Sequence, residues 1–173
     1  MEKRISSKRI FEGKVLNLRV DEVEIENGPI ATREIVEHRG ATAIVPILDS
    51  QEVILVRQYR YPVESELLEI PAGTLQLNED PEDCAARELE EETGYRCTQL
   101  TKLTECFVAP GYSSEKIHIY LAKGLTKTQT MMDEDEKITV ETYPFSEALE
   151  KIRRGEIRDA KSMVGLQAAA RFQ

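Results

Sequence analysis

Residues 73–95 read GTLQLNEDPEDCAARELEEETGY, a loop followed by a dense acidic stretch. Asp80 and Pro81 are typical of a helix start, with Asp as the N-cap and Pro at the first helical position. Gly94 suits the left-handed conformation that ends many helices. We therefore predict a helix from Pro81 to about Thr93.

Three glutamates of this helix share one face. Glu88 and Glu92 are four residues apart and Glu91 follows Glu88 by three, so their side chains project from neighbouring positions. Like charges at this spacing repel one another unless a cation lies among them. Clustered carboxylate oxygens are ligands that Mg²⁺ prefers. For this run of glutamates alone a solvated acidic face is the preferred interpretation, and only the wider pattern of residues 73–95 favours the metal site.

Composition excludes some partners. The 173 residues include 23 Lys+Arg and 32 Asp+Glu, a formal net charge of −9. Nucleic acid and anionic membrane surfaces need a basic footprint, so we expect neither as a partner. Cys84, Cys97 and Cys106 form no C-x-x-C pair, so we expect neither a disulfide framework nor a zinc site. With no apolar run of membrane length, a cytoplasmic protein is expected.

Most of the remaining chain has the pattern of β structure. The first forty residues alternate, with a turn at Asn27-Gly28, and the apolar runs 41–48 and 53–56 predict strands buried on both faces. We predict a mixed α/β fold in one domain, residues 1–173, with an N-terminal antiparallel β segment at about 1–40. Further strands are expected near 67–70, 100–108, 116–122 and 138–143, and helices from about 146 and over about 161–172.

The positions from residue 73 to residue 95 follow the pattern G-x5-E-x7-R-E-U-x-E-E-x-G-U, where U is apolar. This pattern resembles the signature of the Nudix hydrolases, with Tyr95 where an aliphatic residue is usual. The resemblance implies a Nudix-type α/β/α sandwich with a mixed sheet. Its loop–helix–loop would bind divalent cations and a nucleoside diphosphate linked to another group. Glu79 is expected to brace the loop and Arg87 the helix.

Position by position, the same resemblance implies a set of metal ligands. Glu88, Glu92 and the backbone carbonyl of Ala72 would bind the ion, and Glu91 would be either an occasional ligand or a supporting group. Mg²⁺ is the expected cofactor, with Mn²⁺ as the alternative ion. Bound metal would offset charge that grows on the diphosphate oxygens and would position a water for in-line attack.

Segments outside residues 73–95 resemble the ADP-ribose pyrophosphatase branch of these hydrolases. They are Arg33-Glu34-Ile35 with His38-Arg39-Gly40-Ala41, the run from Val56 to Arg60, Pro110 within Ala109–Glu115, and Asp133-Glu134-Asp135-Glu136. For Pro110-Gly111 a plain turn is an equal alternative. The substrate-binding residues implied are Arg33, Arg39, Arg60, Pro110, Gly111 and Glu115.

The acidic loop 126–137 would supply the general base. The resemblance points to Glu134 as the group that deprotonates the attacking water and to Glu136 as a further metal ligand, although the residues alone leave either one as the base. A solvated loop is the alternative interpretation. The expected reaction converts ADP-ribose to AMP and ribose 5-phosphate.

Two alternatives to this reaction remain. The substrate could be another nucleotide, such as a nucleoside diphosphate sugar, a dinucleotide or a nucleoside triphosphate, or the chain could be a non-catalytic nucleotide-binding module. The chain has no Trp, and Lys14 stands where an adenine-stacking aromatic side chain is expected, with Phe11 nearby. The resemblance also implies a homodimer in which the N-terminal strands contribute to the neighbour's site.

Overall fold

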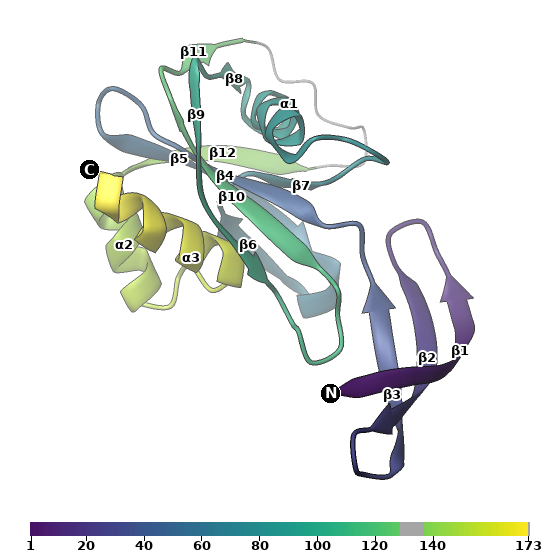
Figure 1. Cartoon of the computed structure of the whole chain (residues 1–173). Coiled ribbons are helices and arrows are strands. Elements are labelled where there is room, and N and C mark those ends of the chain that lie inside the picture. The colour runs from purple at the N-terminus through teal and green to yellow at the C-terminus, as the bar shows by residue number, and fades with distance from the viewer. Residues whose placement is uncertain (129–136, 173) are drawn as a thin grey trace. The chain divides into compact units, whose positions relative to one another are not determined.

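Figure 1 shows the computed structural model of the chain, which describes residues 1–128 and 137–172. Two compact units are present, Met1–Gly40 with Cys106–Lys116 and Ala41–Glu105 with Ile117–Gln173. Glu134 and Glu136 lie outside the described residues. The single domain expected for residues 1–173 stays a prediction.

The elements alternate between strands and a few helices. In chain order they are β1 (Glu2–Glu12), β2 (Asn17–Ile25), β3 (Ile30–Glu37), β4 (Ala41–Pro46), β5 (Glu52–Arg60), η1 (Tyr61–Val63), β6 (Ser65–Glu69), β7 (Ala72–Thr74), α1 (Pro81–Thr93), β8 (Tyr95–Arg96), β9 (Gln99–Phe107), β10 (Lys116–Lys123), β11 (Thr126–Lys127), β12 (Ile138–Pro144), α2 (Phe145–Arg153), α3 (Ala160–Ala169) and η2 (Ala170–Phe172).

The second unit is built on a mixed sheet with the strand order β7-β4-β10-β9. In it β10 runs parallel to β4, whereas β7 is antiparallel to β4. A second sheet has the order β12-β5-β6 and is antiparallel. Every residue of β4 is buried, as are Val53, Ile54, Leu55 and Val56 of β5, which confirms the expectation of strands buried on both faces.

Helices cover both faces of the β7-β4-β10-β9 sheet (Figure 1). On one face Leu89 of α1 packs in a buried cluster with Ile44 of β4. On the other face lies α3, where a Cβ on Gly165 would come within 3.1 Å of Val45 and 3.2 Å of Ile119. Neighbouring residues of a strand point to opposite faces, so β4 serves both layers. The predicted α/β/α sandwich with a mixed sheet is confirmed.

Strand β5 extends farther than the apolar pattern indicated. The apolar run predicted a strand at 53–56, and the resemblance placed the run from Val56 to Arg60 in a strand as well. Strand β5 reaches Arg60, because antiparallel pairing with β6 continues through Tyr59 and Arg60. Backbone hydrogen bonds do not depend on apolar side chains, so the polar end of the strand carries no hydrophobic signal. Arg60 is therefore held by regular sheet structure.

The first unit contains an antiparallel sheet in the order β1-β2-β3. Asn27 has φ +58° in the turn before β3, as the turn signal predicted. The Val36 N–H donates to the Tyr112 carbonyl at 2.8 Å, and the Ser114 N–H donates to the Val36 carbonyl at 2.9 Å. These bonds tie residues 106–116 to β3. Among the described residues, none of the helices is long and apolar enough to cross a membrane.

Candidate metal centre

Helix α1 has the boundaries that its capping residues predicted. The Asp80 side chain accepts a hydrogen bond from the Glu82 N–H at 2.8 Å, and Pro81 follows at the first helical position. At the other end Gly94 has φ +71°, and its N–H donates to the Glu90 carbonyl at 2.9 Å. The two caps therefore keep Glu88, Glu91 and Glu92 within regular helix.

Glu92 links the helix to the strand that precedes the loop. Its side chain is buried, with the residue only 4% exposed, and its Oε2 accepts a hydrogen bond from the Ala72 N–H at 3.0 Å. This bond fixes β7 beside the carboxylate end of α1. Ala72, whose carbonyl is expected to bind metal, therefore lies next to Glu92, one of the expected carboxylate ligands.

Gly73 provides the space for a second carboxylate. A Cβ built on Gly73 would overlap the carboxyl carbon and both oxygens of Glu88. The close approach of the loop backbone to Glu88 is therefore compatible only with a residue that lacks a side chain. Loop and helix form a cradle around this carboxylate.

Arg87 organises the remaining carboxylates. Its Nη1 donates to Glu88 at 2.6 Å and to Glu91 at 2.8 Å, while Nε and Nη2 donate to the two oxygens of Glu79 at 2.9 and 3.1 Å. Glu79 also accepts from the Gln76 N–H at 2.8 Å, which closes the loop. The geometry matches the expectation that Glu79 braces the loop and Arg87 the helix.

The ion pair with Arg87 governs the charge state of Glu79. The hydrogen bonds from Arg87 lower the pKa of Glu79 to about 2, against the opposing effect of burial. The same carboxylate raises the pKa of Arg87 above its usual range. Both groups are charged at neutral pH, so the ion pair between Glu79 and Arg87 is present there.

These residues line a cavity of about 310 Å³. Carboxylates form one side of it and the cation Arg60 of β5 is also part of the wall. The full lining is Gln58, Arg60, Ala72, Gly73, Thr74, Gln76, Arg87, Glu88, Glu91 and Glu92. The structure thus brings together, around one cavity, all the ligands predicted from the described residues and one of the predicted substrate contacts.

The donor set suits a hard cation bound by few protein groups. Within residues 1–128 and 137–172, no three Asp, Glu, His or Cys side chains form a cluster that could hold a metal ion. Mg²⁺ commonly takes one or two carboxylates and completes its shell with waters and substrate phosphates. Glu88 and Glu92 with the Ala72 carbonyl fit that smaller set, if Glu88 exchanges Arg87 for the ion.

Two charged residues behind the cavity escaped the sequence analysis. Glu69 at the end of β6 accepts hydrogen bonds from Arg60, and Lys161 of α3 donates to the same carboxylate at 2.5 Å. The available signal was a single acidic residue inside the apolar run Leu67–Ile70. A charged side chain at a buried strand position requires an oppositely charged partner, and the sequence pattern did not indicate that Arg60 and Lys161 are the partners of Glu69.

Two of the predicted substrate-binding arginines belong to the first unit. Arg33 of β3 is paired with Glu2 of β1, and its Nε donates to Glu2 at 3.1 Å. Arg39 lines a smaller cavity of about 180 Å³ together with Lys14, the residue at the position expected for an adenine-stacking group. Their contact with substrate stays a prediction.

The remaining expected substrate contacts lie in the 106–116 segment of the same unit. Pro110 and Gly111 form a turn in which the Ala109 carbonyl accepts from the Tyr112 N–H at 3.1 Å. The Glu115 carboxylate lies 3.7 Å from the Nδ1 of His38. The turn is the alternative that the Pro-Gly pair allowed, and a role in substrate binding stays a prediction.

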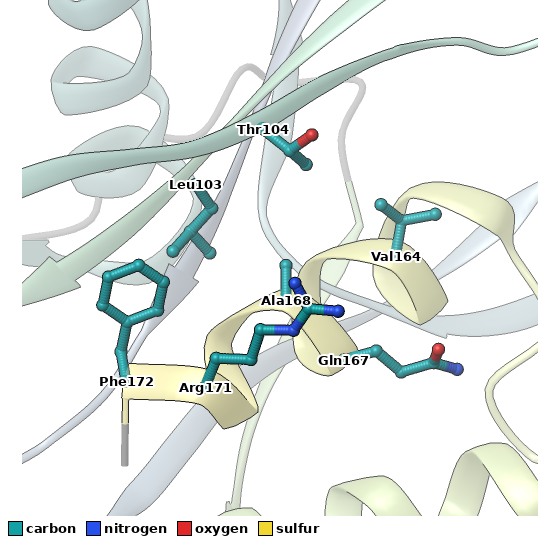
Figure 2. A pocket seen from close by; sticks show the side chains of 7 residues that line it. All are labelled: Leu103, Thr104, Val164, Gln167, Ala168, Arg171 and Phe172. Atoms are coloured by element: carbon teal, nitrogen blue, oxygen red, sulfur yellow. The ribbon is translucent and has the colours of Figure 1, made fainter.

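A larger groove lies between β9 and α3 (Figure 2). Its volume is about 510 Å³, and its lining residues are Leu103, Thr104, Val164, Gln167, Ala168, Arg171 and Phe172. The lining is mostly apolar, with one cation and no carboxylate. This groove is larger than the cavity beside α1, but of these two only the cavity beside α1 is lined by carboxylates that suit a metal ion.

Comparison with known proteins shows the family of the chain. The model of the NUDIX domain matches residues 37–164. A protein from Bacillus methanolicus named methanol dehydrogenase activator is 44% identical, and an ADP-ribose pyrophosphatase from Bacillus subtilis (strain 168) is 42% identical; each alignment covers 96% of this chain and 91% of the relative. A crystal structure of an ADP compounds hydrolase superposes with a TM-score of 0.88 and 25% identity, over 99% of this chain and 93% of that one. The chain therefore belongs to the NUDIX domain family, as the pattern of residues 73–95 predicted.

Proposed function

We propose that this Nudix hydrolase cleaves the diphosphate of ADP-ribose to give AMP and ribose 5-phosphate. The observation that carries the proposal is the cavity that Glu88, Glu91 and Glu92 line together with the cation Arg60. Such a cavity suits a metal-assisted reaction of an anionic substrate. The choice of ADP-ribose is supported by the relative from Bacillus subtilis that bears that name and is 42% identical over 96% of the chain.

The cation is proposed to be Mg²⁺, with Mn²⁺ as the alternative. A divalent ion supplies positive charge for the diphosphate and acidifies a bound water. Glu88, Glu92 and the Ala72 carbonyl would hold it, and Glu91 would ligate it or support the ligands. In the unliganded state Arg87 balances the charge of Glu88, and the site can therefore exist before the ion arrives.

The general base is proposed to be Glu134, with Glu136 as a further metal ligand. A carboxylate near a metal-bound water can accept its proton as the water attacks the phosphorus. Arg60 would bind the diphosphate, and Arg33, Arg39 and Glu115 would contact the adenosine or ribose groups, next to the Pro110-Gly111 turn. The variants Glu134→Gln and Glu136→Gln distinguish these two roles. Loss of the base lowers kcat, whereas loss of a ligand also raises the Mg²⁺ concentration needed for half-maximal activity.

A substrate panel tests the reaction. Purified protein with Mg²⁺ is incubated with ADP-ribose, GDP-mannose, a dinucleotide and ATP, and the products are separated by anion exchange. We expect the highest kcat/KM for ADP-ribose, with AMP and ribose 5-phosphate in equal amounts. Faster hydrolysis of ATP would show that the substrate class is wrong.

The variant Glu92→Gln tests the role of the carboxylate helix. The amide oxygen can still accept the hydrogen bond from the Ala72 N–H, so the fold is expected to persist, but the ligand charge is lost. We expect kcat/KM to fall by at least about a hundredfold. The matched control Glu90→Gln changes a glutamate of the same helix that pairs with Arg96, outside the cavity lining, and should retain activity. Full activity in Glu92→Gln would contradict the proposed site.

A second candidate is a regulatory role toward another enzyme. The relative named methanol dehydrogenase activator is 44% identical over 96% of the chain. Adding wild-type protein or Glu92→Gln to a methanol dehydrogenase separates the alternatives. A rise in dehydrogenase rate with Glu92→Gln would indicate a regulator that acts without hydrolysis, and a rise with wild type alone would make hydrolysis part of the activation.

The chain is further proposed to act as a cytoplasmic homodimer. Large apolar side chains of the first unit are exposed, among them Ile5, Ile10, Phe11 and Ile30, and a partner would cover them. The cysteines of the structure are free thiols, which suits a reducing compartment. Sedimentation equilibrium tests the assembly, and a mass near that of one 19.7 kDa chain would refute it.

A further inference from the structure

Glu69 is a fully buried carboxylate directly behind the wall of the metal cavity. The residue is 1% exposed at the end of β6, three positions before Ala72. It binds the guanidinium of Arg60 through two parallel hydrogen bonds, Nε to Oε1 at 3.1 Å and Nη2 to Oε2 at 2.8 Å. This bidentate arrangement fixes the plane of the guanidinium as well as its position.

The second unit surrounds Glu69 with further bonds. Lys161 donates to its Oε2 at 2.5 Å and to Asp159 at 2.9 Å. The next backbone N–H, that of Ile70, donates to the Ser162 Oγ at 2.8 Å. The N-terminal turn of α3 therefore holds both the side chain of Glu69 and the backbone that follows it.

Glu69 is charged despite its burial. Burial opposes ionisation, but the hydrogen bonds from Arg60 and the charge of Lys161 outweigh it and lower the pKa of Glu69 below its usual value. A buried ion pair adds little net stability, because desolvation cancels most of the attraction between its members. A role in orientation accounts better for this arrangement than a role in stability.

The orientation matters because Arg60 shares its cavity with three carboxylates. Glu88, Glu91 and Glu92 line the same space, and the charge of Glu92 is among the influences that raise the pKa of Arg60, after the larger effect of its hydrogen bonds to Glu69. An arginine without an anchor would be drawn toward these carboxylates and would compete with the cation. The anchor at Glu69 uses Nε and Nη2, so the protons of Nη1 are left for a bound anion.

We propose that Glu69 is a positioning residue for Arg60. It holds the guanidinium on the cavity wall, apart from the metal-binding carboxylates, so that the Nη1 edge meets the diphosphate of the substrate. The identity of that anion rests on the proposed function. Lys161 acts through Glu69, because it donates to the same Oε2 that accepts from Arg60 and so helps to hold the carboxylate in place.

The chain contains a matched control on the same strand. Arg57 of β5 donates from Nε and Nη2 to Glu141 at 2.5 and 3.2 Å, which is the same bidentate pairing. Neither Arg57 nor Glu141 lines the metal cavity. Glu141→Gln therefore removes an equivalent arginine anchor without touching the site.

Kinetics of single and double variants test the proposal. We expect Glu69→Gln to raise KM for ADP-ribose about tenfold with kcat within about twofold, since the lost contact is made in ground and transition states alike. Glu141→Gln should leave KM unchanged. In an Arg60→Met background Glu69→Gln should add no further increase, because the two residues act as one unit. An equal increase with and without Arg60 would overturn the proposal.

A second variant keeps the test valid if Glu69→Gln folds poorly. Glu69→Gln leaves the half-buried ammonium of Lys161 with Asp159 as its one remaining carboxylate partner, and Lys161→Met in the same chain removes that charge. The combined variant should regain thermal stability while its KM stays raised. Recovery of KM together with stability would show that Glu69 is only structural.

The position of Arg60 can also be observed without turnover. The Nε–H of an anchored arginine gives a slowly exchanging signal in ¹⁵N–¹H NMR, and we expect that signal for Arg60 in wild type and in Glu141→Gln but not in Glu69→Gln. Failure of wild type to hydrolyse ADP-ribose would refute the proposed substrate and leave this result intact. Retention of the Arg60 signal in Glu69→Gln would refute the anchor whatever the substrate.

Discussion

The glutamates of α1 and its loop have the same side chain but different surroundings. Glu92 is buried against the backbone N–H of Ala72, Glu79 accepts from Nε and Nη2 of Arg87, and Glu88 occupies the space that Gly73 leaves open. A carboxylate that is permanently paired cannot bind metal, whereas one that shares a single arginine nitrogen can exchange it. These partners therefore distinguish Glu79, which supports the loop, from the proposed ligands Glu88 and Glu92.

Replacement of Gly73 tests the space around Glu88. In Gly73→Ala the new methyl group would occupy the position of the Glu88 carboxylate, which must rotate away. The backbone there is not left-handed, so the fold should tolerate alanine. We expect cation affinity, measured by isothermal titration calorimetry, to fall by about 10–100-fold, the range typical when the support of a metal ligand is lost. Wild-type affinity in this variant would contradict the cradle.

The Glu79–Arg87 brace predicts a pH dependence of stability. The folded pKa of Glu79 is about 2 and its reference value is 4.5, so the carboxylate stabilises the fold above about pH 4.5 and loses this effect as the pH falls toward about 2. Glu79→Gln should lower the free energy of unfolding by about 2 kcal/mol at neutral pH. In urea denaturation the difference from wild type should shrink through that acidic window. A constant difference would show that the brace does not depend on ionisation.

At the scale of elements, α1 was predictable because its signals are local. The cap, the proline and the final glycine all lie within residues 73–95. Strand β7 was not predicted, since Pro71-Ala72-Gly73 has the composition of a turn and only pairing with β4 makes it a strand. Glu69 was missed for the same reason, because Lys161 lies 92 positions away in the sequence. Glu134 and the first-unit arginines stay predictions.

The N-cap of α1 can be tested against a residue of the same type one turn along. Asp80→Ala removes the side chain that accepts from the Glu82 N–H, and this should cost about 1 kcal/mol of unfolding free energy. Asp83→Ala, in the first turn, loses only a favourable charge near the helix end and gains helix propensity, so we expect a change within about 0.5 kcal/mol. Urea denaturation of both variants gives the comparison, and equal losses would contradict the assigned cap.

At the scale of the whole molecule, the formal net charge of −9 favours cation binding. Self-repulsion of like charges weakens a compact acidic fold, and a divalent ion bound at the proposed ligands Glu88 and Glu92 would reduce that repulsion. Because the loop, α1 and β7 come together only in the folded chain, the ion should bind the native state in preference to the unfolded one. Binding and stability are then linked.

This linkage gives a prediction that needs no substrate. At Mg²⁺ about a hundredfold above its Kd, the free energy of unfolding should rise by about 2.7 kcal/mol, and the melting temperature by roughly 5–10 °C. Differential scanning calorimetry with NaCl at equal ionic strength provides the control, since screening alone acts on the whole surface without a saturating site. Glu88→Gln combined with Glu92→Gln should abolish the Mg²⁺-specific increase. An increase that survives both substitutions would place the ion elsewhere in the fold.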